Sequence, residues 1–126
     1  MGASLTAFIP GWTAINVTNG ATLTMAVTDG NATTGNVYNV GALADEERAF
    51  GTLADASITP ALGAVFQNNT GSTVTKVSIQ TKMEQWRQSG NASINESVAF
   101  YYSLDAMSLS TGTWTAVTDL NLNEKL

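Results

Sequence analysis

Residues 76–87 read KVSIQTKMEQWR, and apolar and polar side chains alternate along most of this stretch. Val77, Ile79, Thr81 and Met83 stand at every second position, with Ser, Gln and Lys residues between them. Successive side chains of a β-strand point to opposite faces, so this pattern predicts a strand with one buried and one solvated face. The chain is therefore expected to be built from half-exposed strands.

Turn signals recur along the chain and separate runs that are rich in β-branched and aromatic residues. They are Pro10-Gly11, Asn19-Gly20, Asp29-Gly30-Asn31, Thr34-Gly35-Asn36, Asn68-Asn69-Thr70-Gly71, Ser89-Gly90-Asn91 and Thr111-Gly112. The predicted strands lie near residues 12–18, 21–28, 36–40, 48–54, 61–68, 73–87, 96–104 and 114–122. A short helical turn is expected at residues 44–47, where acidic residues suit a helix N-terminus. Gly63 in mid-strand predicts a bulge or the close approach of another backbone.

These short strands predict an all-β fold, an antiparallel β-sandwich of jelly-roll type. The strands at 73–87 and 96–104 are expected near its centre. The predicted core consists of Val77, Ile79, Met83, Phe66, Val98, Phe100 and Leu104. With 126 residues the chain can bury about two-thirds of the surface that its unfolded form exposes, so residues 1–126 are interpreted as a single domain.

Composition excludes several classes of function. The chain is 44% apolar and only 12% charged, and five basic against ten acidic residues give a net charge of −5. Binding to a nucleic-acid backbone requires clustered cations, and the basic residues are scattered, so no nucleic-acid partner is expected. No apolar run is long enough to cross a membrane, so no membrane insertion is expected.

Catalysis is not expected either. The sequence contains no His and no Cys, which removes the commonest general base, the commonest transition-metal ligand and thiolate chemistry. It also lacks a nucleophile elbow and a phosphate-cradling glycine loop. The chain is therefore predicted not to be an enzyme.

The candidate ligand-binding residues are aromatic and charged side chains near the end of the chain. They are Trp86, Glu84, Arg87, Tyr101 and Trp114. An aromatic ring can stack on the face of a sugar while a carboxylate accepts hydrogen bonds from its hydroxyls. Alternatively, Trp86 plugs the edge of the sandwich while Glu84 forms a structural ion pair with Arg87 or Arg48. The sequence does not show which aromatic residues share a face.

Two short clusters offer oxygen ligands to Ca²⁺, namely Asp29 with Asn31, and Asp45 with Glu46. Calcium takes six to eight oxygen ligands, so neither cluster suffices without backbone carbonyls and a distant partner. A turn is the favoured interpretation of the first cluster, and a solvated or helix-capping acidic run that of the second. No cofactor is required, and Ca²⁺ stays an open alternative.

Several short sequence motifs, in the order in which they occur, resemble those of a known kind of module. The motifs are Gly11-Trp12, Thr34 to Tyr38, Glu47 to Leu53, Gly63 to Gly71, Glu84-Gln85-Trp86-Arg87, Phe100 to Ala106 and Thr111 to Trp114. Together they resemble modules that recur in large secreted or surface-anchored bacterial multidomain proteins, including extracellular nucleases. The resemblance covers nearly the whole chain and implies a secreted β-sandwich accessory module without an enzymatic activity of its own.

The chain departs from that pattern at its C-terminal end. Modules of this kind look longer after the position of Leu122, so the closing strands and any metal-binding acids in them are in doubt here. Residues 1–5 lack the basic segment and the apolar core of a signal peptide, which is compatible with an expression start.

These observations indicate two alternative functions. The preferred one is a non-catalytic accessory module of a secreted or cell-surface bacterial protein that binds a polysaccharide or a cell-surface glycan. The alternative is a structural or adhesive module that spaces domains, or that assembles with itself or a strand-donating partner through an open sheet edge. A glycan binder should display two or more aromatic residues on one exposed face, and a spacer should not.

Overall fold

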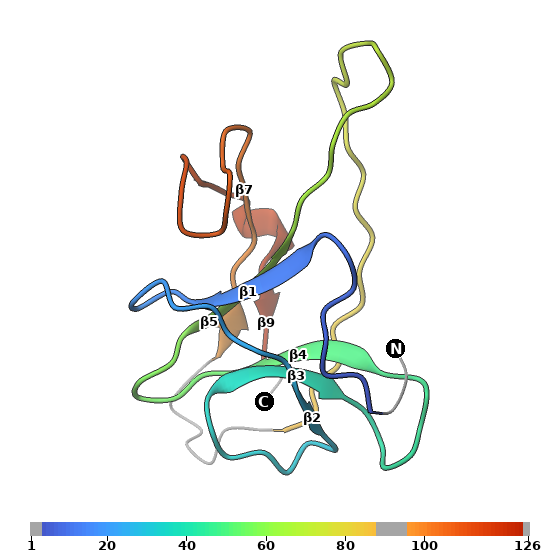
Figure 1. The fold of residues 1–126 in the computed structure, drawn as a ribbon, viewed down its shortest axis with the longest axis vertical. Helices are drawn as coiled ribbons and strands as arrows, with labels where there is room; N and C mark the ends of the chain where they lie inside the picture. Colours follow the sequence, from blue (N-terminus) through green and yellow to red (C-terminus); the bar gives the residue numbers. More distant parts are fainter. Residues whose placement is uncertain (1–3, 88–95, 125–126) are drawn as a thin grey trace. The chain divides into compact units, whose positions relative to one another are not determined.

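The computed structural model of the chain describes residues 4–87 and 96–124, and β-strands dominate its regular structure (Figure 1). The strands are β1 (Trp12–Asn16), β2 (Ala26–Thr28), β3 (Asn36–Val40), β4 (Ala49–Leu53), β5 (Pro60–Ala64), β6 (Ser97–Val98), β7 (Tyr101–Tyr102), β8 (Thr115–Ala116) and β9 (Leu122–Asn123), and one 3-10 turn, η1, covers Thr118–Leu120. The prediction of an all-β chain with antiparallel sheets is confirmed.

The chain divides into two compact units. The first unit comprises Met1–Phe66 and Ala106–Thr111, and the second comprises Gln67–Asp105 and Gly112–Leu126. The interpretation of residues 1–126 as one domain stays a prediction.

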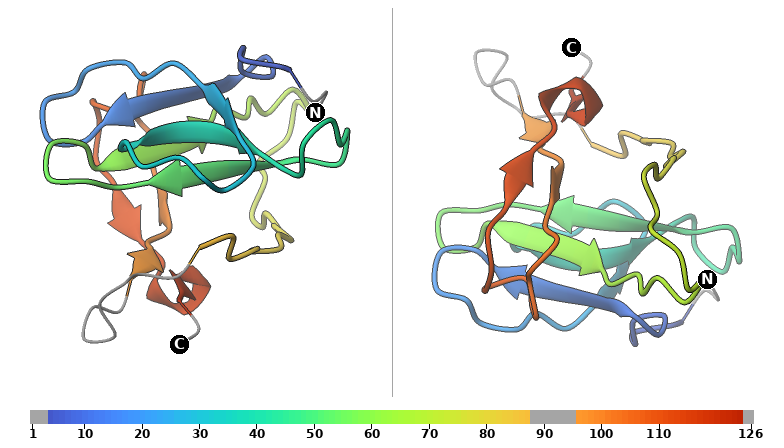
Figure 2. Two further views of the ribbon diagram at one scale, coloured as in Figure 1. Left: turned by 90° about the horizontal axis from the view of Figure 1, so that it is seen from below. Right: turned by 90° about the horizontal axis from the view of Figure 1, so that it is seen from above.

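The first unit contains a three-stranded sheet in the order β2-β3-β4, and its strands β3 and β4 lie side by side in Figures 1 and 2. These two strands are antiparallel, with Tyr38 opposite Gly51. β2 pairs with β3 in the parallel direction, with Ala26 opposite Tyr38. This parallel pair departs from the expected antiparallel arrangement, because residues 29–35 carry the chain back to the starting end of the sheet before β3 begins.

The second sheet of this unit is the antiparallel pair β1–β5, with Trp12 opposite Ala64 and Thr13 opposite Gly63. The pairing continues through all five positions, so Gly63 does not mark a bulge. A Cβ atom at this position would instead collide with the side chain of Leu109. The prediction of a bulge or of another backbone close to Gly63 is therefore wrong, and the glycine makes room for the Leu109 side chain.

The buried apolar residues that the structure describes all lie in the first unit. They are Ala14, Met25, Val37, Tyr38 and Val40. Beside them, the Phe50 ring lies 4.9 Å from the Trp12 ring and 6.1 Å from the Phe8 ring, centroid to centroid. Such tilted ring pairs add to the stabilisation that burial of apolar surface provides. Trp12 and Tyr38 are thus packing residues.

Arg48 links the ends of two strands through its guanidinium group. Nε donates to Oδ1 of Asn39, Nη1 donates to the Ala42 carbonyl, and Nη2 donates to the carbonyls of Thr28 and Asn39, all at 2.8 Å. The Asn39 side chain is fully buried, and its Nδ2 donates to the Leu5 carbonyl at 2.9 Å. The planar fork of arginine can satisfy several acceptors at once, which explains why this residue type holds the position.

Asn16 performs a similar role at the end of β1. Its side chain is 4% exposed, its Nδ2 donates to the Ser57 carbonyl at 3.0 Å, and its Oδ1 accepts the backbone N–H groups of Thr59 and Thr18 at 3.0 and 3.2 Å. Backbone N–H and C=O groups that leave water on folding cost free energy unless they find a new hydrogen-bond partner. The Asn16 amide provides that partner for three such groups. Asn16 therefore fixes the chain that leads into β5 against the end of β1.

Asp55 joins the start of β3 to the loop after β4. Its carboxylate accepts the backbone N–H groups of Gly35 at 2.7 Å, Ser57 at 2.8 Å and Ile58 at 2.9 Å. These bonds, that of Ser57 first, hold the pKa of Asp55 below its usual range because they favour the charged form. Burial and the Asp55 charge raise the pKa of Tyr38, whose hydroxyl donates to the Thr34 carbonyl at 2.6 Å.

The lowered pKa of Asp55 predicts a pH dependence of stability. A carboxyl group with a lower pKa in the folded state stabilises the protein above its unfolded pKa of about 3.9, and this contribution disappears as the pH falls through the lowered value. In Asp55→Asn we expect the melting temperature to fall less steeply than in the wild type below about pH 4. Thermal melts at several acid pH values measure this, and parallel wild-type and variant curves would contradict it.

The second unit contains two short antiparallel pairs. Ser97 and Val98 of β6 pair with Asn123 and Leu122 of β9, and β7 pairs with β8. The predicted strands at 96–104 and 114–122 are thus confirmed only as short segments, and η1 interrupts the second of them.

The predicted strand at 73–87 is wrong, because the structure shows no strand or helix in this range. Thr73 to Met83 make no backbone–backbone hydrogen bond. Alternation shows which residues would share a face, but a strand also needs a neighbouring backbone to pair with its N–H and C=O groups. No residue within 4–87 and 96–124 provides such a neighbour, and the segment is an extended coil.

The predicted core is also wrong, since all but one of its members are exposed. Exposed fractions are 74% for Val77, 53% for Ile79, 40% for Met83, 84% for Phe66, 47% for Val98 and 94% for Leu104, and only Phe100 is half-buried. The buried apolar residues belong to β1, β3 and the chain before β2, because the longest ladders that the structure describes, β1–β5 and β3–β4, lie in the first unit.

The helical turn expected at residues 44–47 is a non-helical turn. The Asp45 N–H donates to the Ala42 carbonyl at 3.1 Å, and the Glu47 N–H donates to Oδ1 of Asp45 at 2.9 Å. Ala44 has a positive φ of 60°, which a right-handed helix does not allow. The acidic side chain binds its own turn instead of capping a helix.

Candidate functional site

The β7–β8 ladder positions two of the predicted ligand-binding residues. Tyr101 lies opposite Ala116, and Tyr102 lies opposite Thr115. Residues directly opposite each other in an antiparallel pair project to the same face, and neighbours along a strand project to opposite faces. Tyr101 and Tyr102 therefore present their rings on opposite faces of this ladder.

Trp114 precedes β8 by one residue. It stands two positions before Ala116, the partner of Tyr101. Continuing the alternation of β8 by one residue puts Trp114 and Tyr101 on one face as diagonal neighbours. Diagonal neighbours lie within reach of each other when their side chains are aromatic. Both rings are exposed, at 38% for Trp114 and 52% for Tyr101. We call this pair the aromatic face.

A polar turn closes the connection beside the aromatic face. Oδ1 of Asp105 accepts the Ser103 hydroxyl and the Thr113 backbone N–H, each at 2.8 Å. These two hydrogen bonds, that of Thr113 first, lower the pKa of Asp105, so this carboxyl group stays charged. Sequence reasoning missed Asp105; its signal was a serine two positions before an aspartate, a pattern that favours side-chain-bonded turns.

Glu84 and Trp86 form the second group of predicted site residues. Trp86 Nε1 donates to Oε2 of Glu84 at 3.1 Å, and the Trp86 side chain is 43% exposed. The carboxylate therefore fixes the ring while leaving much of it accessible. Arg87 follows Trp86 in the same segment. The five candidate residues thus fall into two pairs, Tyr101 with Trp114 and Glu84 with Trp86. Arg87 belongs to neither pair.

The end of this segment is tied to the β6–β9 pair. Gln85 Nε2 donates to Oε1 of Glu124 at 3.3 Å, and Oε2 of Glu124 accepts the Glu96 backbone N–H at 3.2 Å. The Glu124 backbone N–H in turn donates to the Glu96 carbonyl at 2.8 Å. These bonds order the chain next to Trp86, and none of the three residues was a sequence candidate.

Within the first unit, the Arg48 guanidinium binds the carbonyl oxygens at the ends of β2 and β3 and the Asn39 side chain. Glu84 accepts a hydrogen bond from Trp86. The structural ion pair of Glu84 with Arg87 or Arg48 stays a prediction.

The calcium candidates form local turns. Oδ1 of Asp29 accepts the Asn31 backbone N–H at 3.3 Å, and Oδ1 of Asp45 accepts that of Glu47. Within residues 4–87 and 96–124 there is no group of three or more acidic side chains that could hold a metal ion. Glu46 is exposed in the second turn.

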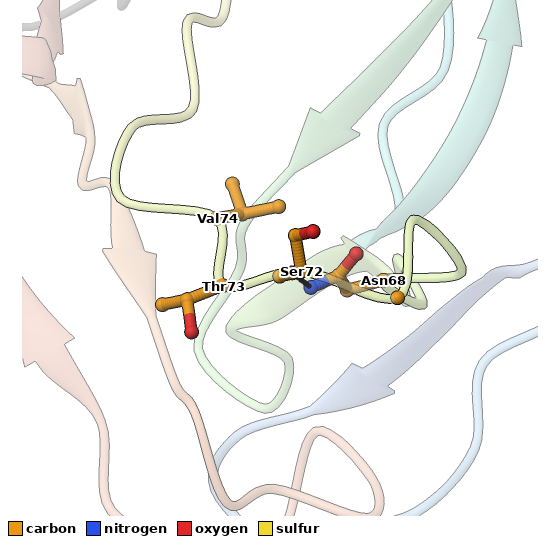
Figure 3. A pocket seen from close by; sticks show the side chains of 5 residues that line it. Asn68, Ser72, Thr73 and Val74 are labelled. Carbon is orange, nitrogen blue, oxygen red and sulfur yellow. Dashed lines mark hydrogen bonds between the residues drawn. The ribbon is translucent and has the colours of Figure 1, made fainter.

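A shallow hollow in the second unit is lined by Asn68, Gly71, Ser72, Thr73 and Val74 (Figure 3). The Asn68 amide lies against Ser72, to whose carbonyl its Nδ2 donates at 2.8 Å, and its Oδ1 accepts the Thr70 backbone N–H at 3.0 Å. The polar atoms of Asn68 therefore hold the turn together. The hollow offers little apolar surface and no charged group to a ligand.

No known protein family matches this chain, and neither does any curated protein or any solved structure. The resemblance to modules of secreted bacterial proteins therefore stays a prediction. The described part of the chain has no helix of the length and hydropathy that a membrane span requires.

Proposed function

We propose that this chain is a non-catalytic accessory module of a secreted or cell-surface bacterial protein, and that its aromatic face binds carbohydrate. The observation that carries the proposal is the register of β7 and β8 together with the exposure of Tyr101 and Trp114. Continued by one residue, this register puts the two rings on a common face. This is the feature that distinguishes a glycan-binding surface from a spacer.

The chemistry of the aromatic face fits a polysaccharide or a cell-surface glycan. Two neighbouring rings can stack on the apolar faces of consecutive sugar units, and the Tyr101 hydroxyl can exchange hydrogen bonds with sugar hydroxyls. Binding of this kind requires no cofactor. The pair of Trp86 and Glu84 offers a second ring with a carboxylate beside it, and Oε1 of Glu84 accepts no hydrogen bond from the described residues.

The wider setting of the proposal is a β-sandwich of jelly-roll type. The all-β structure supports this arrangement, and so does the order of the sequence motifs that resemble secreted bacterial modules. The same resemblance supports a secreted or cell-surface location. The proposal includes no catalytic residue, and Ca²⁺ would act only as a stabilising ion.

Thermal melts of the purified chain with a panel of microbial and algal cell-wall oligosaccharides test the proposal. A sugar that binds only the folded chain raises stability by about 2.7 kcal/mol at a hundred times its Kd, which moves the melting temperature by several degrees. We expect one sugar class to produce this shift and Trp114→Ala to abolish it. Phe66→Ala removes an exposed aromatic ring elsewhere and should keep the shift.

Two outcomes would count against carbohydrate binding. If no sugar moves the melting temperature, the alternative of a structural or adhesive module is favoured. If Trp114→Ala and Phe66→Ala both retain the shift, a sugar binds but not at the aromatic face.

A further inference from the structure

Residues 76–84 contain the clearest strand pattern of the sequence, yet they pair with no strand in the described part of the chain. Figure 1 draws this stretch without an arrow, as an extended coil in the yellow part of the colour range. Its backbone N–H groups make no hydrogen bond to other described residues, and the same holds for the Lys76 side chain. A strand with an open row of donors and acceptors is a template for another strand.

The charged residues of this stretch are complementary to those of a second copy that runs in the antiparallel direction. If a second copy pairs in the antiparallel direction with Gln80 opposite Gln80, Lys76 lies opposite Glu84 of the second copy, and the reverse also holds. Two opposite-charge pairs then flank the two-fold axis. Glu84 has a carboxylate oxygen available, because only Oε2 accepts the Trp86 indole.

The apolar side chains match in the same register. Val77 lies opposite Met83 and Ile79 opposite Thr81, so the exposed apolar residues of both copies gather on one face. A one-residue shift would put apolar residues opposite polar ones. A two-residue shift in one direction brings Lys76 opposite Lys82, and in the other direction it brings Val77 opposite Gln85.

We infer that residues 76–84 form a self-association site, in which two copies of this chain pair as antiparallel strands about a two-fold axis at Gln80. The closed symmetry limits the assembly to a dimer at this site. This inference concerns a different surface from the aromatic face and does not depend on carbohydrate binding.

Cysteine cross-linking tests the register directly, because the wild-type chain contains no cysteine. Gln80→Cys places two thiols opposite each other across the axis, within the distance that a disulfide spans. Ser78→Cys is the matched control, since in this register it faces Lys82 and lies about 13 Å along the strand from its own copy. On mild oxidation we expect Gln80→Cys to form a covalent dimer at least about ten times faster than Ser78→Cys.

Charge reversal tests the interaction energy. Lys76→Glu replaces two attractive pairs by two repulsive ones and should weaken dimerisation by about tenfold in sedimentation equilibrium at about 100 µM protein without sugar. Lys76→Glu combined with Glu84→Lys should restore it. Both substituted side chains are exposed, so folding should persist and is checked by the melting temperature.

Three results would overturn the inference. The first is a wild-type chain that stays monomeric under these conditions. The second is equal cross-linking of Gln80→Cys and Ser78→Cys. The third is a dimer whose stability does not respond to the charge at position 76. Sedimentation without sugar separates these failures from a failure of carbohydrate binding.

Discussion

Arg48→Ala is expected to lower the stability of the first unit by about 3 kcal/mol, because the Oδ1 atom of the buried Asn39 loses the Arg48 donor and three backbone carbonyl bonds to the charged guanidinium are lost with it. The substitution removes all four hydrogen bonds of the guanidinium group, including the one to the fully buried Asn39. In a chain of this size, such a loss should lower the melting temperature by about 10 °C.

Arg48→Lys tests whether the planar geometry of the guanidinium matters beyond its charge. Lys82→Ala is the control for the loss of a cation at an exposed position. Lysine keeps the charge but cannot present a planar fork, so Arg48→Lys should retain less than about half of the stabilisation. Lys82→Ala removes an exposed cation and should change stability by less than about 0.5 kcal/mol. Equal melting temperatures for Arg48→Ala and Lys82→Ala would contradict the assigned role of Arg48.

Asn16→Ala is expected to lower stability by about 2 kcal/mol. The substitution leaves the Thr59 and Thr18 N–H groups without their acceptor and the Ser57 carbonyl without its donor, at a site that is 4% exposed. Chemical denaturation followed by circular dichroism measures the loss.

Asn19→Ala is the matched control for Asn16→Ala. The Asn19 side chain is exposed, and its Oδ1 accepts only the local Ala21 N–H at 3.0 Å. Its replacement should cost less than about 1 kcal/mol. A cost for Asn16→Ala no larger than that for Asn19→Ala would show that the buried amide does not hold the end of β1.

Local signals in the sequence predicted the strands of the first unit. The expected strand at 36–40 coincides with β3, and those at 12–18, 48–54 and 61–68 overlap β1, β4 and β5. Turn residues on both sides of these runs limit where a strand can begin and end, so the sequence contains this information locally.

Residues 73–87 show why the same reasoning fails elsewhere. Their alternation specifies two faces, but pairing depends on a backbone that the local pattern does not identify. The predicted core failed for the same reason, since Val77 and Ile79 become buried only if a strand pairs beside them and another layer covers them.

The candidate site was predictable in part. The proximity of Glu84 and Trp86 follows from their spacing of two in an extended segment. The common face of Tyr101 and Trp114 does not follow from sequence, because it depends on the register that places Ala116 opposite Tyr101. The contribution of Asp105 depends on a long-range bond to the Thr113 N–H, which spacing alone does not show.

A comparison of Tyr101→Ala with Tyr102→Ala tests the proposed aromatic face most directly. The two tyrosines are neighbours in β7 with similar exposure, 52% and 45%, but the register places them on opposite faces. In affinity electrophoresis through gels that contain the polysaccharide identified by the melts, Tyr101→Ala should bind at least about tenfold more weakly than the wild type, and Tyr102→Ala should bind like the wild type. Equal binding by the two variants would contradict the account.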